Sequence, residues 1–200
     1  MSETFQTETI ESHGITVRIE YFYDYDTGAP WIENDGHGVI RSVRSNDYLR
    51  YATSKKPGEV LFHAGRGRDT WIYDIQETTK IAKRDGWGVS NAPEGLTPKQ
   101  ITALAVHRDF EYCKGWINDD WHYAGIVCTV LDSEGEETDI VDSCWGFETL
   151  NDYHEAAAHD MAQNLAESTH TARLTAWREA LKEARARKYW ACRDIQTVGA

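Results

Sequence analysis

The sequence predicts an α+β domain in which an antiparallel sheet of three or four strands carries helices mainly on one face. Three observations predict it. Residues 15–22 alternate between apolar and polar side chains, two later β-rich runs are joined by a polar turn with a central glycine, and helical stripes follow capping signals in the middle of the chain. The chain has 200 residues, the length of one ordinary domain, so we expect residues 1–200 to form a single domain.

The N-terminal part of the chain begins with polar and acidic residues, and we expect residues 1–12 to be a flexible lead. The alternation at 15–22 then predicts a strand. Residues 24–58 have no clear period and contain several Gly and Pro residues. A connection of this length is uncommon in a domain and is often functional. Residues 60–63 are typical of a short strand, and 64–69 of turn material.

Two capping signals predict helices in the middle of the chain. Asp74 is followed three residues later by Glu77, and Gly86 closes the segment, so we expect a short helix that runs to residue 84. The run Thr97-Pro98-Lys99-Gln100 is a better start signal, because it combines a cap, a proline at the first helical position and the partner residue of a capping box. A mostly apolar stripe continues from there to about Ile117.

The next segment predicts a β-hairpin. Residues 121–131 and 138–147 are β-rich, and the polar residues 132–137 with their central glycine lie between them. Residues 150–193 then predict a C-terminal helical segment, with an apolar stripe at Leu174, Trp177, Leu181 and Ala184. The run 168–171 leaves open whether this segment is one helix or two. The stripe is typical of a helix docked on its own sheet, and the alternative is the seam of a homodimer.

The composition of the chain limits the classes of partner and the cellular compartment that we expect. The formal net charge is −12, which disfavours direct binding to nucleic acid, because phosphates repel the chain as a whole. No apolar run approaches the length of a membrane span, so we expect no membrane partner. The polar start of the chain predicts no signal peptide, and none of the four cysteines forms a C-x-x-C pair. We therefore expect a cytoplasmic protein.

The negative charge is concentrated in one segment. Residues 131–155 contain nine carboxylates and no Lys or Arg, whereas basic residues gather in the central loop region and on the last helix. Clustered carboxylates repel one another, so the cluster requires an explanation. We weigh solubility with protection of a sheet edge, capture of a metal ion, and imitation of nucleic-acid phosphates toward a protein partner. For the third alternative the candidate partner-binding residues are Asp132, Glu134, Glu136, Glu137, Asp139, Asp142, Glu148 and Asp152.

The most site-like short segment is Asp35-Gly36-His37-Gly38, because glycine on both sides leaves the imidazole accessible. Asp24 and Asp26 are nearby in sequence, so a metal or acid–base site formed by Asp24, Asp26, Asp35 and His37 is the alternative hypothesis. The alternative interpretation of His37, without a functional role, is a turn histidine that forms a hydrogen bond within its loop. No nucleophile–base motif or cofactor fingerprint is present, so we expect no cofactor and lean against an enzyme.

Several short segments carry a resemblance. These are Tyr23-Asp24-Tyr25-Asp26, Asp35-Gly36-His37-Gly38 and Asn118-Asp119-Asp120-Trp121-His122, together with Gly28-Ala29-Pro30-Trp31, residues 80–87 and Ser143-Cys144-Trp145-Gly146. Over about residues 20–165 the chain resembles a family of uncharacterised phage and prophage proteins. The resemblance implies a phage accessory protein of the anti-CRISPR or anti-restriction type, and it carries over no catalytic residue.

Together these observations lead to three functional hypotheses. The first is an inhibitor that binds a host defence protein or effector complex through its acidic residues, in the host cytoplasm. The second is a small metal-binding enzyme centred on the loop of Asp24, Asp26, Asp35 and His37. The third is an oligomeric phage structural component that associates through the C-terminal stripe.

Overall fold

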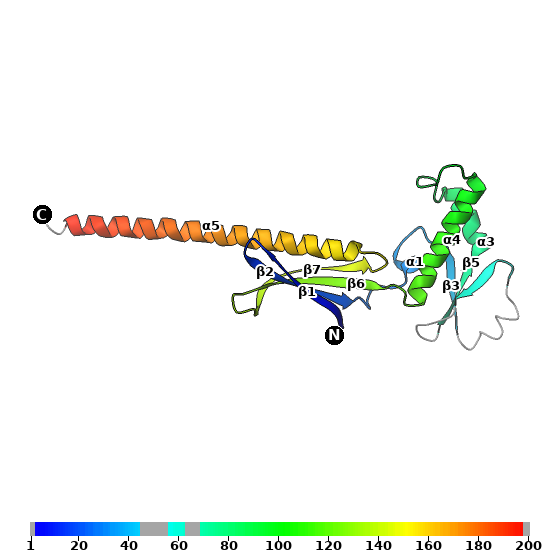
Figure 1. Cartoon of the computed structure of the whole chain (residues 1–200), viewed down its shortest axis with the longest axis horizontal. Coiled ribbons are helices and arrows are strands. Elements are labelled where there is room, and N and C mark those ends of the chain that lie inside the picture. Colours follow the sequence, from blue (N-terminus) through cyan, green and yellow to red (C-terminus); the bar gives the residue numbers. More distant parts are fainter. Residues whose placement is uncertain (1–2, 45–55, 63–68, 198–200) are drawn as a thin grey trace. The chain divides into compact units, whose positions relative to one another are not determined.

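The computed structural model describes residues 3–44, 56–62 and 69–197, and these residues form two antiparallel sheets with helices (Figure 1). The predicted α+β class is confirmed. The sequence led us to expect a single domain, and the chain divides into two compact units. Unit 1 consists of residues 1–23, 124–147 and 151–200, and unit 2 of residues 24–123 and 148–150. Unit 2 is thus an insertion between two strands of unit 1, each unit with a sheet of its own.

The sheet of unit 1 has four strands in the order β1-β2-β6-β7. The strands are β1 (Thr4–Ser12), β2 (Ile15–Tyr23), β6 (Tyr123–Leu131) and β7 (Glu137–Glu148). The predicted hairpin corresponds to β6 and β7. The expectation of a flexible lead at residues 1–12 is wrong, because β1 pairs with β2 along its length. His13 and Gly14 both have positive φ and form a two-residue hairpin loop, which matches the twist of the flanking strands.

The core of unit 1 lies between this sheet and α5 (Tyr153–Thr197). The alternation predicted for β2 is confirmed, because Ile15, Val17, Ile19 and Tyr21 are buried while the residues between them are half-buried. Alanines of α5 at positions 158, 162 and 166 are fully buried against these strands. Their small side chains, four residues apart, form one line that lets the helix lie close to the sheet.

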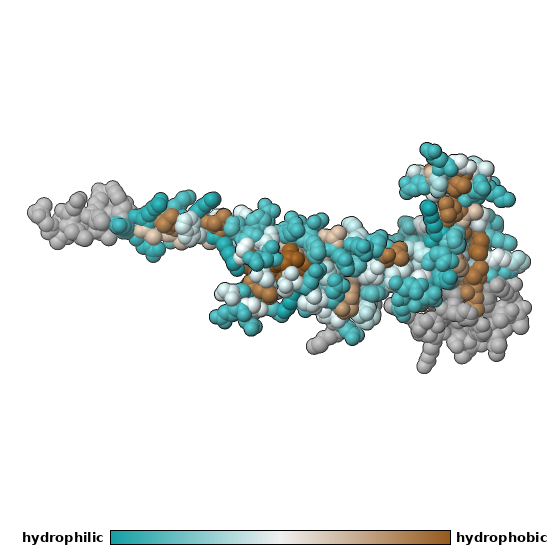
Figure 2. Space-filling view, viewed as in Figure 1, coloured by the Kyte–Doolittle hydropathy of each residue, from teal (hydrophilic) through white to brown (hydrophobic). Residues whose placement is uncertain are grey.

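The predicted C-terminal helical segment is one continuous helix rather than two. The hydroxyls of Ser168 and Thr175 donate to carbonyls of the preceding turn, which satisfies them without breaking the helix. Residues 171–188 are exposed apart from the half-buried Leu181, because this part of α5 runs past the sheet of its unit (Figures 1 and 2). No helix in the described part of the chain is both long enough and apolar enough to cross a membrane.

Unit 2 contains a three-stranded sheet in the order β3-β5-β4, formed by β3 (Val39–Arg44), β5 (Asp69–Asp74) and β4 (Glu59–Phe62). Its helices are α1 (Pro30–Glu33), α3 (Ile75–Asp85) and α4 (Pro98–Ile117). Both predicted caps are confirmed. The Asp74 carboxylate accepts the amide of Glu77, and Thr97 with Gln100 forms the capping box of α4. The short helix α1 and strand β3 therefore lie in the region 24–58 that the sequence left without periodic structure, and β4 corresponds to the short strand predicted at residues 60–63.

Aromatic side chains fill the core of unit 2. Tyr73 is fully buried against α4, and the indole of Trp31 lies edge-on to those of Trp71 and Trp116, at 5.1 and 5.3 Å between ring centroids. Rings of this size bury a large apolar area per residue, which allows a small sheet and two main helices to enclose a core. The loop that carries His37 enters β3 directly, and α4 packs on the same core.

Candidate functional site

The structure separates the eight carboxylates that the sequence proposed as a partner-binding set. Asp132 begins the turn between β6 and β7, and its Oδ1 accepts the backbone amides of Glu134 at 2.8 Å and Glu136 at 2.9 Å. These amides lower the pKa of Asp132 below its usual value. Asp132 is therefore both an exposed charge and the residue that holds the turn in shape.

The carboxylates of β7 lie on both of its faces. Glu137 forms an ion pair with Arg18, which also contacts Glu20 at 3.1 Å. Asp139 is exposed two residues further along, on the same face as Glu137. Asp142 lies on the other face, toward the core and α5, where burial and this carboxylate raise the pKa of Cys128 to about 11.

The last two residues of the set lie away from the turn, at the end of β7 and just before α5. Glu148 belongs to unit 2 and accepts the hydroxyl of Tyr112 at 2.6 Å. Asp152 is exposed just before α5. Five exposed carboxylates therefore remain together on the turn and on β7, the edge strand of the sheet. We call Asp132, Glu134, Glu136, Asp139 and Asp142 the acidic edge. Within residues 3–44, 56–62 and 69–197, none of these five forms an ion pair.

The structure does not bring together the four residues of the alternative metal hypothesis. Asp24 holds a turn, because its carboxylate accepts the amides of Asp26 and Thr27 at 3.1 Å and the Thr27 hydroxyl at 2.7 Å. Asp26 and Asp35 are exposed. Among the described residues, His37 is the only one of the four in a cluster of three potential metal-ligating groups. In the part of the chain that the structure describes, no three of these four lie together as one group of potential metal ligands.

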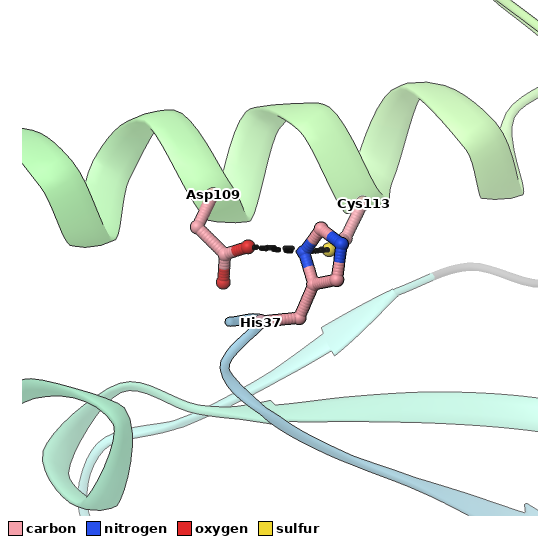
Figure 3. A group of neighbouring side chains, drawn as sticks. All are labelled: His37, Asp109 and Cys113. Carbon is pink, nitrogen blue, oxygen red and sulfur yellow. Dashed lines mark hydrogen bonds and ion pairs between the residues drawn. The ribbon is translucent and has the colours of Figure 1, made fainter. Parts of the chain in front are cut away.

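His37 lies instead against two residues of α4 that the sequence interpretation missed (Figure 3). Its Nδ1 is 2.8 Å from Asp109 Oδ1 and 3.9 Å from Cys113 Sγ. The Cys113 thiol is also within 3.8 Å of Asp109 Oδ1. Asp109 and Cys113 are four residues apart, so one face of α4 presents both. We call His37, Asp109 and Cys113 the His–Asp–Cys cluster.

The second carboxylate oxygen of Asp109 is fixed by two donors. It accepts the backbone amide of Gly38 at 2.8 Å and the hydroxyl of Tyr73 at 2.6 Å. Burial and the Asp109 carboxylate raise the pKa of the Tyr73 hydroxyl well above its usual value, so it remains a donor. A Cβ on residue 38 would lie only 2.5 Å from the Tyr73 hydroxyl oxygen, which explains a glycine at this position.

An aromatic ring also fixes the orientation of the His37 imidazole. The imidazole stacks on the ring of Tyr112, with 5.2 Å between the centroids and 11° between the planes. A cavity of about 430 Å³ reaches the cluster from the region between Trp87 and α4, and its lining includes Gly36 and Asp109. His37 and Asp109 are therefore half-buried, Cys113 is fully buried, and the cavity lies beside Asp109.

This arrangement does not suit nucleophilic catalysis. In a cysteine–histidine–aspartate relay the carboxylate contacts one ring nitrogen and the thiol the other, whereas Asp109 and Cys113 both face Nδ1. Burial also raises the pKa of the Cys113 thiol, which opposes formation of the nucleophilic thiolate. What the cluster offers is one nitrogen, one oxygen and one sulfur donor, all within 4.8 Å of one another.

Comparisons of the chain with protein-family models, with curated proteins and with solved structures give no match. The resemblance to phage proteins therefore stays a prediction.

Proposed function

We propose that the protein binds a basic, nucleic-acid-binding protein through the acidic edge and thereby blocks the partner's contact with nucleic acid. The observation that carries this proposal is the row of five exposed carboxylates on a sheet edge, without ion-pairing cations in the described part of the chain. Unpaired like charges on one edge raise the free energy of the free protein. A basic surface relieves this repulsion on binding.

The spacing of the charges supports a phosphate-like surface. Alternate residues of a strand are about 6.7 Å apart, which is twice the rise of about 3.4 Å between successive phosphates of one DNA strand. Asp139 has this spacing from Glu137 on one face of β7, but Glu137 is paired with Arg18 and lies outside the acidic edge. Within the described residues, the unpaired charges that extend the row from Asp139 are those of the turn. A channel that binds a nucleic-acid backbone with Lys and Arg side chains can therefore engage the acidic edge with the same groups.

The biological setting that we propose follows the resemblance given above. A phage accessory protein acts in the host cytoplasm, and the nucleic-acid-binding proteins that oppose a phage are those of host defence complexes. We therefore propose inhibition of such a complex as the function, in which the protein acts by binding rather than as an enzyme. The like charge of the edge and of nucleic acid favours a protein partner.

A pull-down from host lysate with a matched pair of variants tests this proposal. In the edge variant, Glu134→Gln, Glu136→Gln, Asp139→Asn and Asp142→Asn remove four charges but leave Asp132 to hold the turn. The control variant neutralises four exposed carboxylates elsewhere, Glu94→Gln, Asp120→Asn, Glu167→Gln and Glu179→Gln. Both variants have the same net charge, so a difference between them reports position rather than total charge.

We expect the wild-type chain and the control variant to retain a nucleic-acid-binding protein, and the edge variant to lose it. Retention should weaken steeply with salt, and duplex DNA should displace the protein in competition. Equal retention by the edge variant, or a ternary complex in which DNA and the protein bind together, would contradict the proposal.

Self-association through α5 is a second candidate, favoured by a specific observation. On the part of α5 past the sheet, the side chains of Leu174 and Trp177 are 39% and 62% exposed. With Leu181 they lie at positions i, i+3 and i+7, the spacing of a coiled-coil seam. An oligomeric phage component could use this stripe, and light scattering distinguishes it from a monomer.

A further inference from the structure

The geometry of α4 places two metal-ligating groups on one face of a helix. Asp109 and Cys113 are one helical turn apart, and the loop before β3 brings His37 between them (Figure 3). Two ligands at i and i+4 on one helix face can bind the same ion, as the two histidines of H-E-x-x-H zinc sites do, and here the loop supplies a third donor.

The residues that surround the cluster orient its side chains, as the groups behind metal ligands do in known metal sites. The amide of Gly38 and the hydroxyl of Tyr73 both donate to Asp109 Oδ2 and leave Oδ1 directed at the histidine and the thiol. Tyr112 fixes the plane of the His37 ring by stacking. Hydrogen bonds of this kind set the orientation of first ligands and strengthen metal binding.

The donor separations are close to those of a tetrahedral zinc site. Donors that lie about 2.0–2.3 Å from a Zn²⁺ ion are about 3.3–3.6 Å from one another. In the cluster the two separations that involve Cys113 Sγ are 3.8 and 3.9 Å, and that between His37 Nδ1 and Asp109 Oδ1 is 2.8 Å. Shifts of about 0.5 Å, within the range of side-chain adjustment, would place all three donors around one ion.

We propose that His37, Asp109 and Cys113 form a site for a single Zn²⁺ ion. A mixed nitrogen, oxygen and sulfur donor set selects zinc over Mg²⁺ and Ca²⁺, which prefer oxygen ligands. Three protein ligands leave a fourth position for water or another small ligand, as in open zinc sites. The cavity lined by Gly36 and Asp109 provides the path by which the ion and this fourth ligand enter.

Binding displaces protons in a defined way. The Cys113 thiol releases its proton to solvent and binds as the thiolate. His37 shifts to the tautomer that is protonated on Nε2, as the proton on Nδ1 leaves to solvent and Nε2 takes one up, and it binds through the lone pair of Nδ1. Asp109 exchanges its contact with the imidazole N–H for the ion and retains its bonds from Gly38 and Tyr73.

Titration of the full chain with Co²⁺, a spectroscopic substitute for zinc, tests the site. After treatment with a chelator and under reducing conditions, we expect one equivalent of Co²⁺ to give tetrahedral d–d bands and a thiolate-to-cobalt charge-transfer band. One equivalent of Zn²⁺ should bleach both. Cys113→Ser should abolish the charge-transfer band and weaken Co²⁺ binding by at least about tenfold. Cys144→Ser, which changes an exposed thiol of unit 1, should leave both unchanged.

A second variant covers the case in which Cys113→Ser fails to fold, as circular dichroism would reveal. His37→Gln keeps the thiol and the helix and should still weaken Co²⁺ binding by at least about tenfold. The absence of a saturable cobalt spectrum in the wild-type chain would overturn the proposal. A charge-transfer band that persists in folded Cys113→Ser, or unchanged affinity in His37→Gln, would also overturn it.

Discussion

The indole of Trp145 on β7 lies directly over Gly125 on β6. A Cβ at residue 125 would lie 2.1 Å from the indole ring, far inside van der Waals contact. Phe22 on the neighbouring strand is near the same ring, at 6.1 Å between centroids. This contact anchors the edge strand that carries the acidic edge, on the sheet face opposite to α5.

Substitution Gly125→Ala should therefore destabilise unit 1. The added methyl group displaces Trp145, and overpacking of this kind costs about 1–3 kcal/mol in the free energy of unfolding. Chemical denaturation followed by far-UV circular dichroism measures the loss. In the background of Trp145→Ala the same substitution should cost much less, because the ring that it strikes is absent. An equal cost in both backgrounds would show that the contact with Trp145 does not determine the residue at 125.

The bond from Tyr73 to Asp109 gives a second prediction, for unit 2. Tyr73→Phe removes the hydroxyl and leaves the Asp109 carboxylate with one donor fewer in a half-buried site. We expect a loss of about 1–3 kcal/mol in the stability of unit 2, since a bond to a charged acceptor is lost. Calorimetry of the full chain measures this loss as a lower melting temperature of unit 2. Tyr153→Phe is the control, because that ring is 68% exposed. Equal melting temperatures for the two variants would contradict the prediction.

The elements that could be predicted are those whose signal is local. The alternation at residues 15–22 and the caps at Asp74 and Thr97 depend on neighbours within four residues, and the structure has them as expected. The division into two units could not be predicted, because it depends on the pairing of β2 with β6. In this pairing Tyr23 is the partner of Ala124, although residues 24–123 separate the two in the sequence. No linker composition marks the boundaries, since the chain passes from strand to loop without a run of Gly, Pro or Ser.

The candidate site was predicted in part only, because one of its residues has a local signal and the other two do not. His37 was singled out because its flanking glycines are a local signal, but its partners are 72 and 76 residues further along the chain. The spacing of Asp109 and Cys113 on a correctly predicted helix was the available signal, and it indicates a shared face without indicating what that face meets. Asp24, Asp26 and Asp35 are near His37 in sequence only. Proximity in a loop is a poor guide to convergence of side chains.

Glu8 gives a prediction about pH. A hydrogen bond from Tyr21, followed by the contact with His159, lowers the pKa of Glu8 below its usual value. A carboxyl with a lowered pKa in the folded state stabilises the protein above its unfolded pKa, and this stabilisation is lost as the pH falls through the folded value. Glu8→Gln should therefore lower the melting temperature of unit 1 at neutral pH.

The difference between wild type and Glu8→Gln should shrink as the pH falls from the unfolded pKa of about 4.3 through the lowered folded pKa, and it should vanish where Glu8 is protonated in both states. Melting curves between acidic and neutral pH measure it. Glu11→Gln, an exposed substitution on the same strand, provides the matched control. A difference that stays constant over the whole range would show that the Glu8 charge does not contribute to folding.

The last prediction concerns the exposed part of α5. Residues 171–188 carry six Lys or Arg and two Glu, and the positions beside the stripe of Leu174, Trp177 and Leu181 are largely basic. Two copies that meet through this stripe place arginines against arginines, so the repulsion opposes the apolar contact at low ionic strength. We expect a monomer in low salt and a rising fraction of dimer as salt screens the flanks. Light scattering coupled to size-exclusion chromatography measures the mass.

Trp177→Glu should hold the chain monomeric at every salt concentration, because it places a charge in the apolar seam. Ala176→Glu adds the same charge about 100° around the helix and should leave the dimer intact. A mass that does not change with salt or protein concentration would rule out self-association through α5. The salt dependence also separates the two proposed interactions. Screening strengthens contact between two basic helices, whereas it weakens attachment of the acidic edge to a basic partner.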